Sequence, residues 1–321
     1  MSVGVLAPRA ADAAVARVVR DGLFRADKQL PAWLLYDEQG SRLFERITTL
    51  PSYYLTRAER AILLREAGAI LDAVGADITE VVELGAGTAT KSQLLLETIV
   101  ARRGRARFVP VDVSAAPVEL ARSRLAREVP GVTVAPMFLQ HAAALAALAA
   151  RPTPRAVLFL GSSIGNLDEA EAAALLYGVA RCLGGGALVL GTDLRKAPAV
   201  LVPAYDDPEG VSAAFNLNVL HRINRELGAR FEPAAFRHVA TWNEAGSRMD
   251  MYLESLREQA VPIAALGLTV RLRRGERIHT ESSRKYGDAD VDALVAAAGM
   301  VRTHTWTDAA GRFAVHVGRV P

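Results

Sequence analysis

Apolar and polar positions alternate through the middle of the chain in a pattern that predicts strands separated by helices. Short apolar runs that favour strands are followed by Ala- and Leu-rich segments with one charged face, such as 115–128 and 168–182. The connections between them are short, which is typical of a parallel sheet covered by helices on both faces. The predicted strands are 80–84, 107–113, 132–137, 156–161 and 187–193.

The C-terminal pattern predicts a helix followed by a hairpin. A helix over 290–298 ends at Gly299, and two strand-like runs follow, 301–307 and 312–317, joined by the turn 308–311. A hairpin that adds an antiparallel last strand to a parallel core is the arrangement of a class I methyltransferase sheet. The expected fold class is therefore α/β and Rossmann-like.

Two segments, 1–59 and 196–285, do not continue this alternation. Because the sheet pattern resumes after the second of them, we expect 60–195 and 286–321 to form one domain around the sheet. The N-terminal arm and the insertion would then form a second, α+β domain that binds the substrate, with the substrate in a cleft between the domains.

The first predicted strand runs into the most informative motif of the chain, VVELGAGT at 81–88. The paired glycines Gly85 and Gly87 predict a tight turn into a helix that opens near Thr90, and they let the backbone approach a ligand closely. Asp112 ends the next predicted strand, where its carboxylate can accept hydrogen bonds from both hydroxyls of a ribose. A glycine pair alone also occurs in ordinary turns, so the prediction of an adenosine-bearing cofactor depends largely on Asp112.

Two residues favour S-adenosylmethionine over a dinucleotide. Thr90 stands where the fingerprint G-x-G-x-x-G/A has its third small residue, and Glu83 precedes the glycines. Both features look more like methyltransferases than NAD enzymes. An NAD-dependent oxidoreductase stays open as an alternative, as does a non-catalytic protein that binds a small molecule on this fold.

Composition narrows the range of partners. The chain has 321 residues, 51% of them hydrophobic, which excludes a disordered or fibrous protein. Its formal net charge of +3 comes from interspersed acidic and basic residues, without a basic block that contains aromatics, so no nucleic-acid partner is expected.

The cysteine, histidine and hydropathy patterns indicate the cellular compartment and whether a metal site is expected. The single cysteine, Cys182, lies in an apolar helical stretch and suits a reducing compartment. No run reaches the ~18 apolar residues of a membrane-spanning helix, so we expect a cytoplasmic protein without a membrane partner. The six histidines show no paired ligand spacing, and no metal is expected.

Several segments taken together resemble one known family. They are YDEQGS at 36–41, LPSYYLTR at 50–57, FLGSSIGN at 159–166, GTDL at 191–194, FNLNVL at 215–220 and TESS at 280–283. These resemble the histidine Nα-methyltransferases of ergothioneine biosynthesis, and the similarity runs over nearly the whole chain. The resemblance implies a monomeric two-domain enzyme that transfers three methyl groups from S-adenosylmethionine to the α-amine of L-histidine, giving the trimethylated betaine hercynine.

The resemblance also implies residue roles. For the cofactor it implies Tyr36 near the sulfonium, Gly85, Gly87 and Lys91 near the methionine portion, Asp112 on the ribose, Gln140 and His141 at the adenine, and Gly161. For the substrate it implies Asn166 and Tyr205 at the carboxylate, Tyr53 beside the amine, Glu281 and Ser283 at the imidazole, and Met251 beside the ring. Tyr36 and Tyr53 are the catalytic candidates, as hydroxyls that orient the amine, and no general base is assigned.

Some of these roles have support from the residues themselves. If 280–284 is extended, Glu281 and Ser283 point the same way and can reach the two ring nitrogens of one imidazole. Spacing alone favours a solvated acid and serine on an edge strand. The sequence pattern alone also favours a core position for Met251, and a turn or a helix N-cap for Asn166.

The chain departs from the family after the third predicted strand. There the family usually has an acidic residue followed by phenylalanine, which contact adenine, and this chain has Gln140 and His141. A glutamine carbonyl still accepts a hydrogen bond from the adenine amino group, without the charge that strengthens it. A related alternative is methylation of the α-amine of another amino acid, such as a tryptophan derivative, although Glu281 argues against a purely apolar indole pocket.

Overall fold

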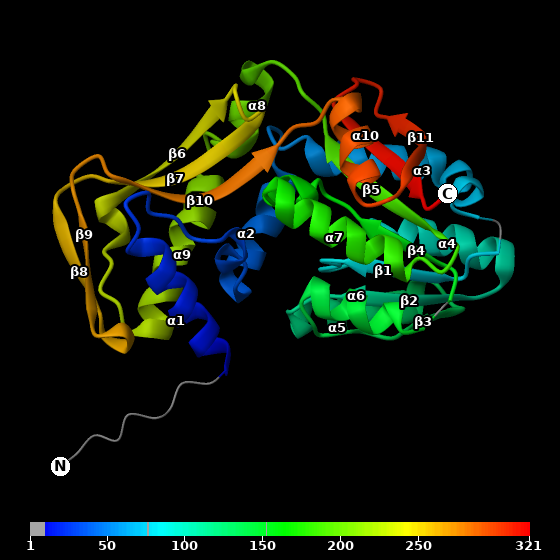
Figure 1. Cartoon of the computed structure of the whole chain (residues 1–321), viewed down its shortest axis with the longest axis horizontal. Helices are drawn as coiled ribbons and strands as arrows, with labels where there is room; N and C mark the ends of the chain where they lie inside the picture. Colours follow the sequence, from blue (N-terminus) through cyan, green and yellow to red (C-terminus); the bar gives the residue numbers. More distant parts are fainter. Residues whose placement is uncertain (1–9, 76, 152) are drawn as a thin grey trace, which may run out of the picture. The chain divides into compact units, whose positions relative to one another are not determined.

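The computed structural model describes residues 10–75, 77–151 and 153–321. The backbone divides into two compact units. The sheet unit consists of Leu55–Arg195 and Arg284–Pro321, and the insertion unit of Met1–Tyr54 and Lys196–Ser283 (Figure 1). The domain prediction began the sheet unit at residue 60, which lies inside helix α3 (Leu55–Val74).

The sheet unit is built on a seven-stranded sheet with the order β11-β12-β5-β4-β1-β2-β3 (Figure 1). Five of its strands pair in parallel, and β12 runs antiparallel to both β5 and β11. The strands are β1 Glu80–Leu84, β2 Ala106–Val111, β3 Val132–Val134, β4 Arg155–Phe159, β5 Ala187–Asp193, β11 Val301–Thr307 and β12 Phe313–Arg319. This topology confirms the predicted α/β sheet with its terminal antiparallel hairpin.

Helices cover both faces of this sheet because its central strands are apolar on both sides. One face packs on α6, α7 and α10, with strand residues Val82 and Val157 among the buried side chains of that core. On the other face α3 packs against α4 and against the strands β5 and β12. The helices besides α3 are α4 Ser92–Arg103, α5 Ala115–Glu128, α6 His141–Ala149, α7 Glu169–Cys182 and α10 Asp288–Ala297.

The insertion unit contains two small sheets and four α-helices among its described residues. A three-stranded sheet has the order β10-β7-β6, and β8 pairs antiparallel with β9 (Figure 1). Its strands are β6 Phe236–Asn243, β7 Arg248–Ser255, β8 Gln259–Ile263, β9 Leu268–Leu272 and β10 Arg277–Arg284, whose last residue belongs to the sheet unit. Its helices are α1 Ala10–Leu23, α2 Glu38–Thr49, α8 Pro198–Tyr205 and α9 Val211–Leu227, with the short 3-10 helix η1 at Ala32–Leu35.

Helix α9 is central to the insertion unit. It packs against α1, α2 and β6, and its buried face includes Phe215, Val219 and Ile223. The sequence analysis used 215–220 as a motif without predicting a helix there. Of the described helices, none combines the length and the apolar character that crossing a membrane requires.

Candidate functional site

The glycine turn after β1 and the carboxylate at the end of β2 are joined directly. Gly85 and Gly87 have φ values of 69° and 50°, in the left-handed region that favours glycine. The Gly87 N–H donates to Asp112 Oδ2 at 3.0 Å, and the Ser114 N–H donates to Oδ1 at 2.9 Å. Each carboxylate oxygen keeps a lone pair, so the fixed Asp112 side chain can still accept hydrogen bonds from two hydroxyls.

The glycine turn leaves open space beside its backbone. A Cβ placed on Gly87 would have no atom of the described residues within 4 Å, and one on Gly85 would have its nearest neighbour, His141 Nε2, at 3.8 Å. The turn therefore exposes backbone at the carboxyl ends of the parallel strands, where open α/β sheets bind ligands. With Asp112 as a ribose acceptor beside it, this arrangement suits the predicted S-adenosylmethionine.

A buried carboxylate stands at the neighbouring strand end. Gly161 follows β4 with φ 77°, and its N–H donates to both oxygens of Glu59, at 2.8 and 3.0 Å. Lys91 Nζ lies 2.5 Å from Glu59 Oε2. The structure thus brings the predicted residues Lys91 and Gly161 together through Glu59.

The sequence analysis missed Glu59, although a signal was present. Glu59 belongs to the stripe of α3 that also contains Leu55, Ala58, Ile62 and Leu63, all buried. An acidic residue on the apolar stripe of a helix needs a partner within the protein, because an unpaired buried charge is costly.

The carboxyl group of Glu83, just before the turn, is also buried. Burial raises the pKa of Glu83 to about 7, with the hydrogen bond from Ser92 and the charge of Lys91 acting in the opposite direction. Ser92 Oγ donates to Glu83 Oε2 at 2.7 Å, which ties the end of β1 to the start of α4. The motif residue Glu83 therefore fixes the two ends of the turn through its hydrogen bond with Ser92.

The two residues predicted at the adenine have different surroundings. Gln140 is exposed at the N-cap position of α6, whereas His141, the first residue of α6, meets the Phe159 ring in a T-shaped contact with 5.8 Å between the ring centroids. Burial lowers the pKa of His141, against the effect of the Asp112 charge, so the ring is neutral at pH 7. Of the pair, His141 is the one next to the glycine turn.

Phe138 and Leu139 are further residues near this position that the sequence analysis did not select. Their exposed fractions are 46% and 40%, and they follow Met137, whose carbonyl accepts a hydrogen bond from the Asp112 N–H at 3.2 Å. Two apolar residues directly after the predicted end of the third strand, beside the acid predicted to bind a ribose, were the available signal. Exposed apolar surface at a ligand-binding edge suits a flat aromatic base.

In the insertion unit, five predicted residues from four separate segments form one cluster. Tyr205 Oη and Ser283 Oγ lie 2.9 Å apart, and the rings of Tyr53 and Tyr205 meet edge to face at 6.4 Å. Burial raises the pKa of Tyr36 well above its ordinary value, and the nearby charge of Glu281 adds to this effect. Tyrosine hydroxyls, a serine and a carboxylate thus converge, which suits a small polar substrate.

Strand β10 presents the polar residues of this cluster. The prediction that 280–284 is extended is confirmed, and Glu281 and Ser283 therefore share one face of the strand. Thr280 Oγ1 donates to the Met251 carbonyl at 3.1 Å, which fixes β10 to β7. Met251 itself is 3% exposed and packs with Leu201 and Met249, as expected of a core side chain.

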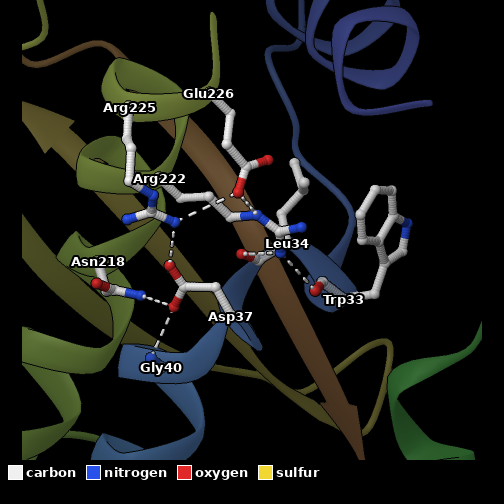
Figure 2. A network of polar contacts seen from close by, with 8 residues as sticks. All are labelled: Trp33, Leu34, Asp37, Gly40, Asn218, Arg222, Arg225 and Glu226. Carbon is white, nitrogen blue, oxygen red and sulfur yellow. Dashed lines mark hydrogen bonds and ion pairs between the residues drawn. The ribbon is translucent and has the colours of Figure 1, made fainter. Parts of the chain in front are cut away.

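A network from α9 holds the segment that contains Tyr36 (Figure 2). Asp37 caps α2 by accepting from the Gly40 N–H at 2.8 Å, and it also accepts from Asn218 at 2.7 Å and from Arg225 at 2.6 Å. Burial works against ionisation of Asp37, but these hydrogen bonds hold its pKa below the ordinary value. Because Tyr36 immediately precedes Asp37, its backbone is anchored next to the cluster.

On the other side of Tyr36, Arg222 donates to the Leu34 carbonyl at 3.0 Å and lies over the Trp33 ring at 5.5 Å (Figure 2). The ring of Tyr36 meets Phe215 and Phe44 edge to face, at 5.2 and 5.5 Å. Backbone and ring are therefore both fixed, which favours a defined direction of the hydroxyl.

Tyr205 has its own support. His238 Nε2 donates to the Tyr205 carbonyl at 2.8 Å, and His238 Nδ1 accepts from Asn216 Nδ2 at 2.8 Å. Asn216 also donates to the Tyr252 carbonyl at 3.1 Å. This chain links the end of α8 to α9 and to the β6–β7 hairpin.

Asn166 is the one predicted substrate residue that belongs to the sheet unit. It ends the short 3-10 helix η2, Ser163–Asn166, in the loop that follows β4. A Cβ on the preceding Gly165 would lie 2.7 Å from the Arg284 carbonyl oxygen, so only glycine lets the backbone at the end of β10 pass so close. The loop that carries Asn166 is therefore packed directly on the segment that follows Ser283.

Comparison with known proteins gives consistent results. The model of a family described as histidine-specific methyltransferase, SAM-dependent, matches residues 15–320. A histidine N-alpha-methyltransferase of Mycolicibacterium smegmatis is 44% identical over 96% of this chain and 95% of its own length, and one of Mycobacterium tuberculosis is 44% identical over 94% and 93%. Ergothioneine biosynthesis protein 1 of Neurospora crassa is 31% identical over 87% of this chain, which spans 32% of that longer protein.

Among solved structures, the CcbJ methyltransferase of Streptomyces caelestis superposes with a TM-score of 0.48 and 17% identity, over 89% of this chain and 99% of its own. The mitomycin 7-O-methyltransferase MmcR gives a TM-score of 0.48 and 13% identity, over 97% of this chain and 69% of its own.

Proposed function

Because this chain belongs to the histidine-specific, S-adenosylmethionine-dependent methyltransferases, we propose that it methylates the α-amine of L-histidine. The observation that carries the proposal is the cluster of Glu281 and Ser283 with three tyrosines, all in the insertion unit. We further propose that three successive transfers give hercynine, as the first step of ergothioneine biosynthesis. The similarity to a histidine N-alpha-methyltransferase and to an ergothioneine biosynthesis protein supports the histidine substrate and the pathway, whereas the number of transfers is our proposal.

The substrate side of the proposal assigns a role to each polar residue of the cluster. Glu281 accepts a hydrogen bond from one ring nitrogen of the substrate and Ser283 bonds to the other, because both point from the same face of β10. Tyr205, 2.9 Å from Ser283, and Asn166 hold the substrate carboxylate. Tyr53 lies beside the amine.

On the cofactor side, the proposal assigns the binding of S-adenosylmethionine to residues of the sheet unit. When bound, S-adenosylmethionine supplies a methyl group activated by its sulfonium. Asp112 accepts the ribose hydroxyls, the backbone at Gly85 and Gly87 lies against the cofactor, and Lys91 binds its carboxylate. We place the adenine between His141 and Phe138, and Gln140 at its rim.

The chemistry requires positioning more than covalent help from the protein. An amine lone pair held about 3 to 3.5 Å from the methyl carbon reacts as if in a unimolecular step. The amine must be neutral to attack the methyl carbon. We assign Tyr36 the role of a hydrogen-bonding group that orients the amine, and we assign no general base.

Incubation of the protein with L-histidine and S-adenosylmethionine tests this function directly. Mass spectrometry should show mono-, di- and trimethylated histidine, with the methyl groups on the α-nitrogen. Tryptophan in the same assay tests the alternative acceptor, and its methylation in preference to histidine would contradict the proposal. Size-exclusion chromatography and cell fractionation check the proposed monomer and its cytoplasmic location.

The Glu281→Ala variant tests the assignment of the imidazole site. Removal of one side of a buried charged hydrogen bond costs about 2 to 5 kcal/mol. We expect a large loss of kcat/KM for histidine with unchanged binding of the cofactor measured by calorimetry. Unchanged histidine kinetics would refute the role of Glu281.

A further inference from the structure

Helix α3 brings a fully buried carboxylate to the carboxyl ends of the parallel strands. Glu59 accepts two hydrogen bonds from the Gly161 N–H and pairs with Lys91 Nζ at 2.5 Å. The exposed fractions of the two charged side chains are 0% for Glu59 and 22% for Lys91. One carboxylate thus joins α3, the residue before α4 and the end of β4.

Two glycines make room for this ion pair. A Cβ on Gly191, in the interior of β5, would stand 2.1 Å from Glu59 Oε1, and one on Gly161 would stand 3.1 Å from Lys91 Nζ. Glycine weakens a strand interior and is typically found there where something approaches closely. At Gly191 the approaching group is the Glu59 carboxylate.

Stabilisation of the fold does not explain such a buried ion pair well. The cost of removing two charges from water commonly exceeds their mutual attraction, and apolar side chains of similar size stabilise a core at least as well. A buried pair that borders a ligand site is better explained by the orientation it imposes on a group that contacts the ligand. Lys91 is the candidate for that group here, because it follows the glycine turn in the chain and its side chain remains partly exposed.

We propose that Glu59 is a positioning residue of the cofactor site, which acts through Lys91. The Lys91 ammonium has three donors, and Glu59 takes one of them. The fixed ammonium then directs its remaining donors to the carboxylate of the amino-acid portion of the cofactor. This inference rests on the proposed function and adds to it the residue that sets the Lys91 geometry.

A double-mutant cycle on the full-length protein tests the proposal. Calorimetry measures the Kd of S-adenosylhomocysteine for the wild type, Glu59→Gln, Lys91→Met and the double variant. We expect each single variant to bind about tenfold more weakly, and the double variant to bind no more weakly than Lys91→Met. In the kinetics of Glu59→Gln, the KM for S-adenosylmethionine should rise while the KM for histidine stays unchanged.

Additive effects in the cycle would overturn the proposal, because they would mean that Glu59 supports the fold independently of Lys91. An unchanged Kd in Lys91→Met would overturn it as well, and Gly191→Ala, which keeps both charged residues, provides the test if the charge variants do not fold. Failure of the wild type to bind S-adenosylhomocysteine would instead refute the proposed function.

Two further variants separate positioning from a general loss of charge or packing. Gly191→Ala displaces the Glu59 carboxylate without changing either charged residue, and it should raise the Kd as Glu59→Gln does. Glu66→Gln makes the same chemical change on the same helix at a carboxylate that pairs with Arg65, and it should leave the Kd unchanged. A Kd that rises equally in Glu66→Gln would contradict the assignment to Glu59.

Discussion

At the residue scale, Glu83 shows how burial beside the glycine turn changes the ionisation of a carboxyl group. Its pKa of about 7 lies above the ordinary 4.5 because burial penalises the ionised form. The folded protein therefore holds a proton on Glu83 between these two pH values that the unfolded chain releases. This contribution to stability is present below about pH 4.5 and is lost as the pH rises to about 7.

The Glu83→Gln variant removes this pH dependence, since an amide keeps an acceptor for Ser92 without ionising. We expect the variant to gain stability relative to the wild type as the pH rises from 5 to 8, by up to about 3 kcal/mol. Urea unfolding at several pH values measures the difference. If the stabilities of the two proteins changed with pH in the same way, Glu83 would not have the raised pKa.

The sequence can point to single residues where a backbone rule applies, and it cannot where the partner of a side chain lies far along the chain. Gly85, Gly87 and Asp112 could be selected because the strand, turn and acid follow each other in the chain. Glu59 could not be paired with Lys91, because an acidic residue in a helix usually faces water and the partner lies in another segment.

At the element scale, one guanidinium completes the ends of two helices. Arg155, 1% exposed at the start of β4, donates to the Leu148 carbonyl at 3.0 Å and to the Cys182 carbonyl at 2.6 Å, in the last turns of α6 and α7. It also pairs with Glu80 at 2.7 Å. The last carbonyls of a helix have no partner within the helix, so Arg155 satisfies groups that burial would otherwise leave unpaired.

The Arg155→Met variant should therefore lose about 3 to 5 kcal/mol of unfolding free energy, because it leaves two helix ends without their partner and removes the buried one of the two arginines that pair with Glu80. Arg107 provides the matched control: it pairs with the same Glu80 at 3.2 Å but is 43% exposed. Arg107→Met should cost about 1 kcal/mol or less. Urea unfolding at pH 7 compares the two, and equal losses would contradict the role given to Arg155.

Element bounds could be predicted best where burial is uniform. Strands β1 and β5 match the predicted 80–84 and 187–193, because every residue in them is buried and glycines follow or precede them. β3 is shorter than the predicted 132–137, with only a bridge from Met137 to Val111 beyond it. β6 was missed because seven of its eight residues remain partly or fully exposed and its pattern is mixed.

At the scale of the whole molecule, the insertion leaves the sheet unit and returns to it at adjacent points. Leu194, after β5, forms a bridge with Tyr286, and the fully buried Asp193 and Lys285 pair at 2.9 Å. The pattern of the sequence shows where the sheet is interrupted, but it does not show that the two interruptions meet. A long insertion is compatible with the sheet because its two ends are fixed side by side.

Hydrogen exchange should resolve the two proposed binding sites, since each ligand protects the amides that it orders. S-adenosylhomocysteine should slow exchange at the glycine turn 83–92 and around Asp112, whereas L-histidine should slow it around Tyr36 and over 279–283. Histidine should also protect 163–166, in the sheet unit, if Asn166 holds the substrate carboxylate. Protection by histidine confined to the insertion unit would remove Asn166 from the substrate site and leave the Glu281 assignment intact.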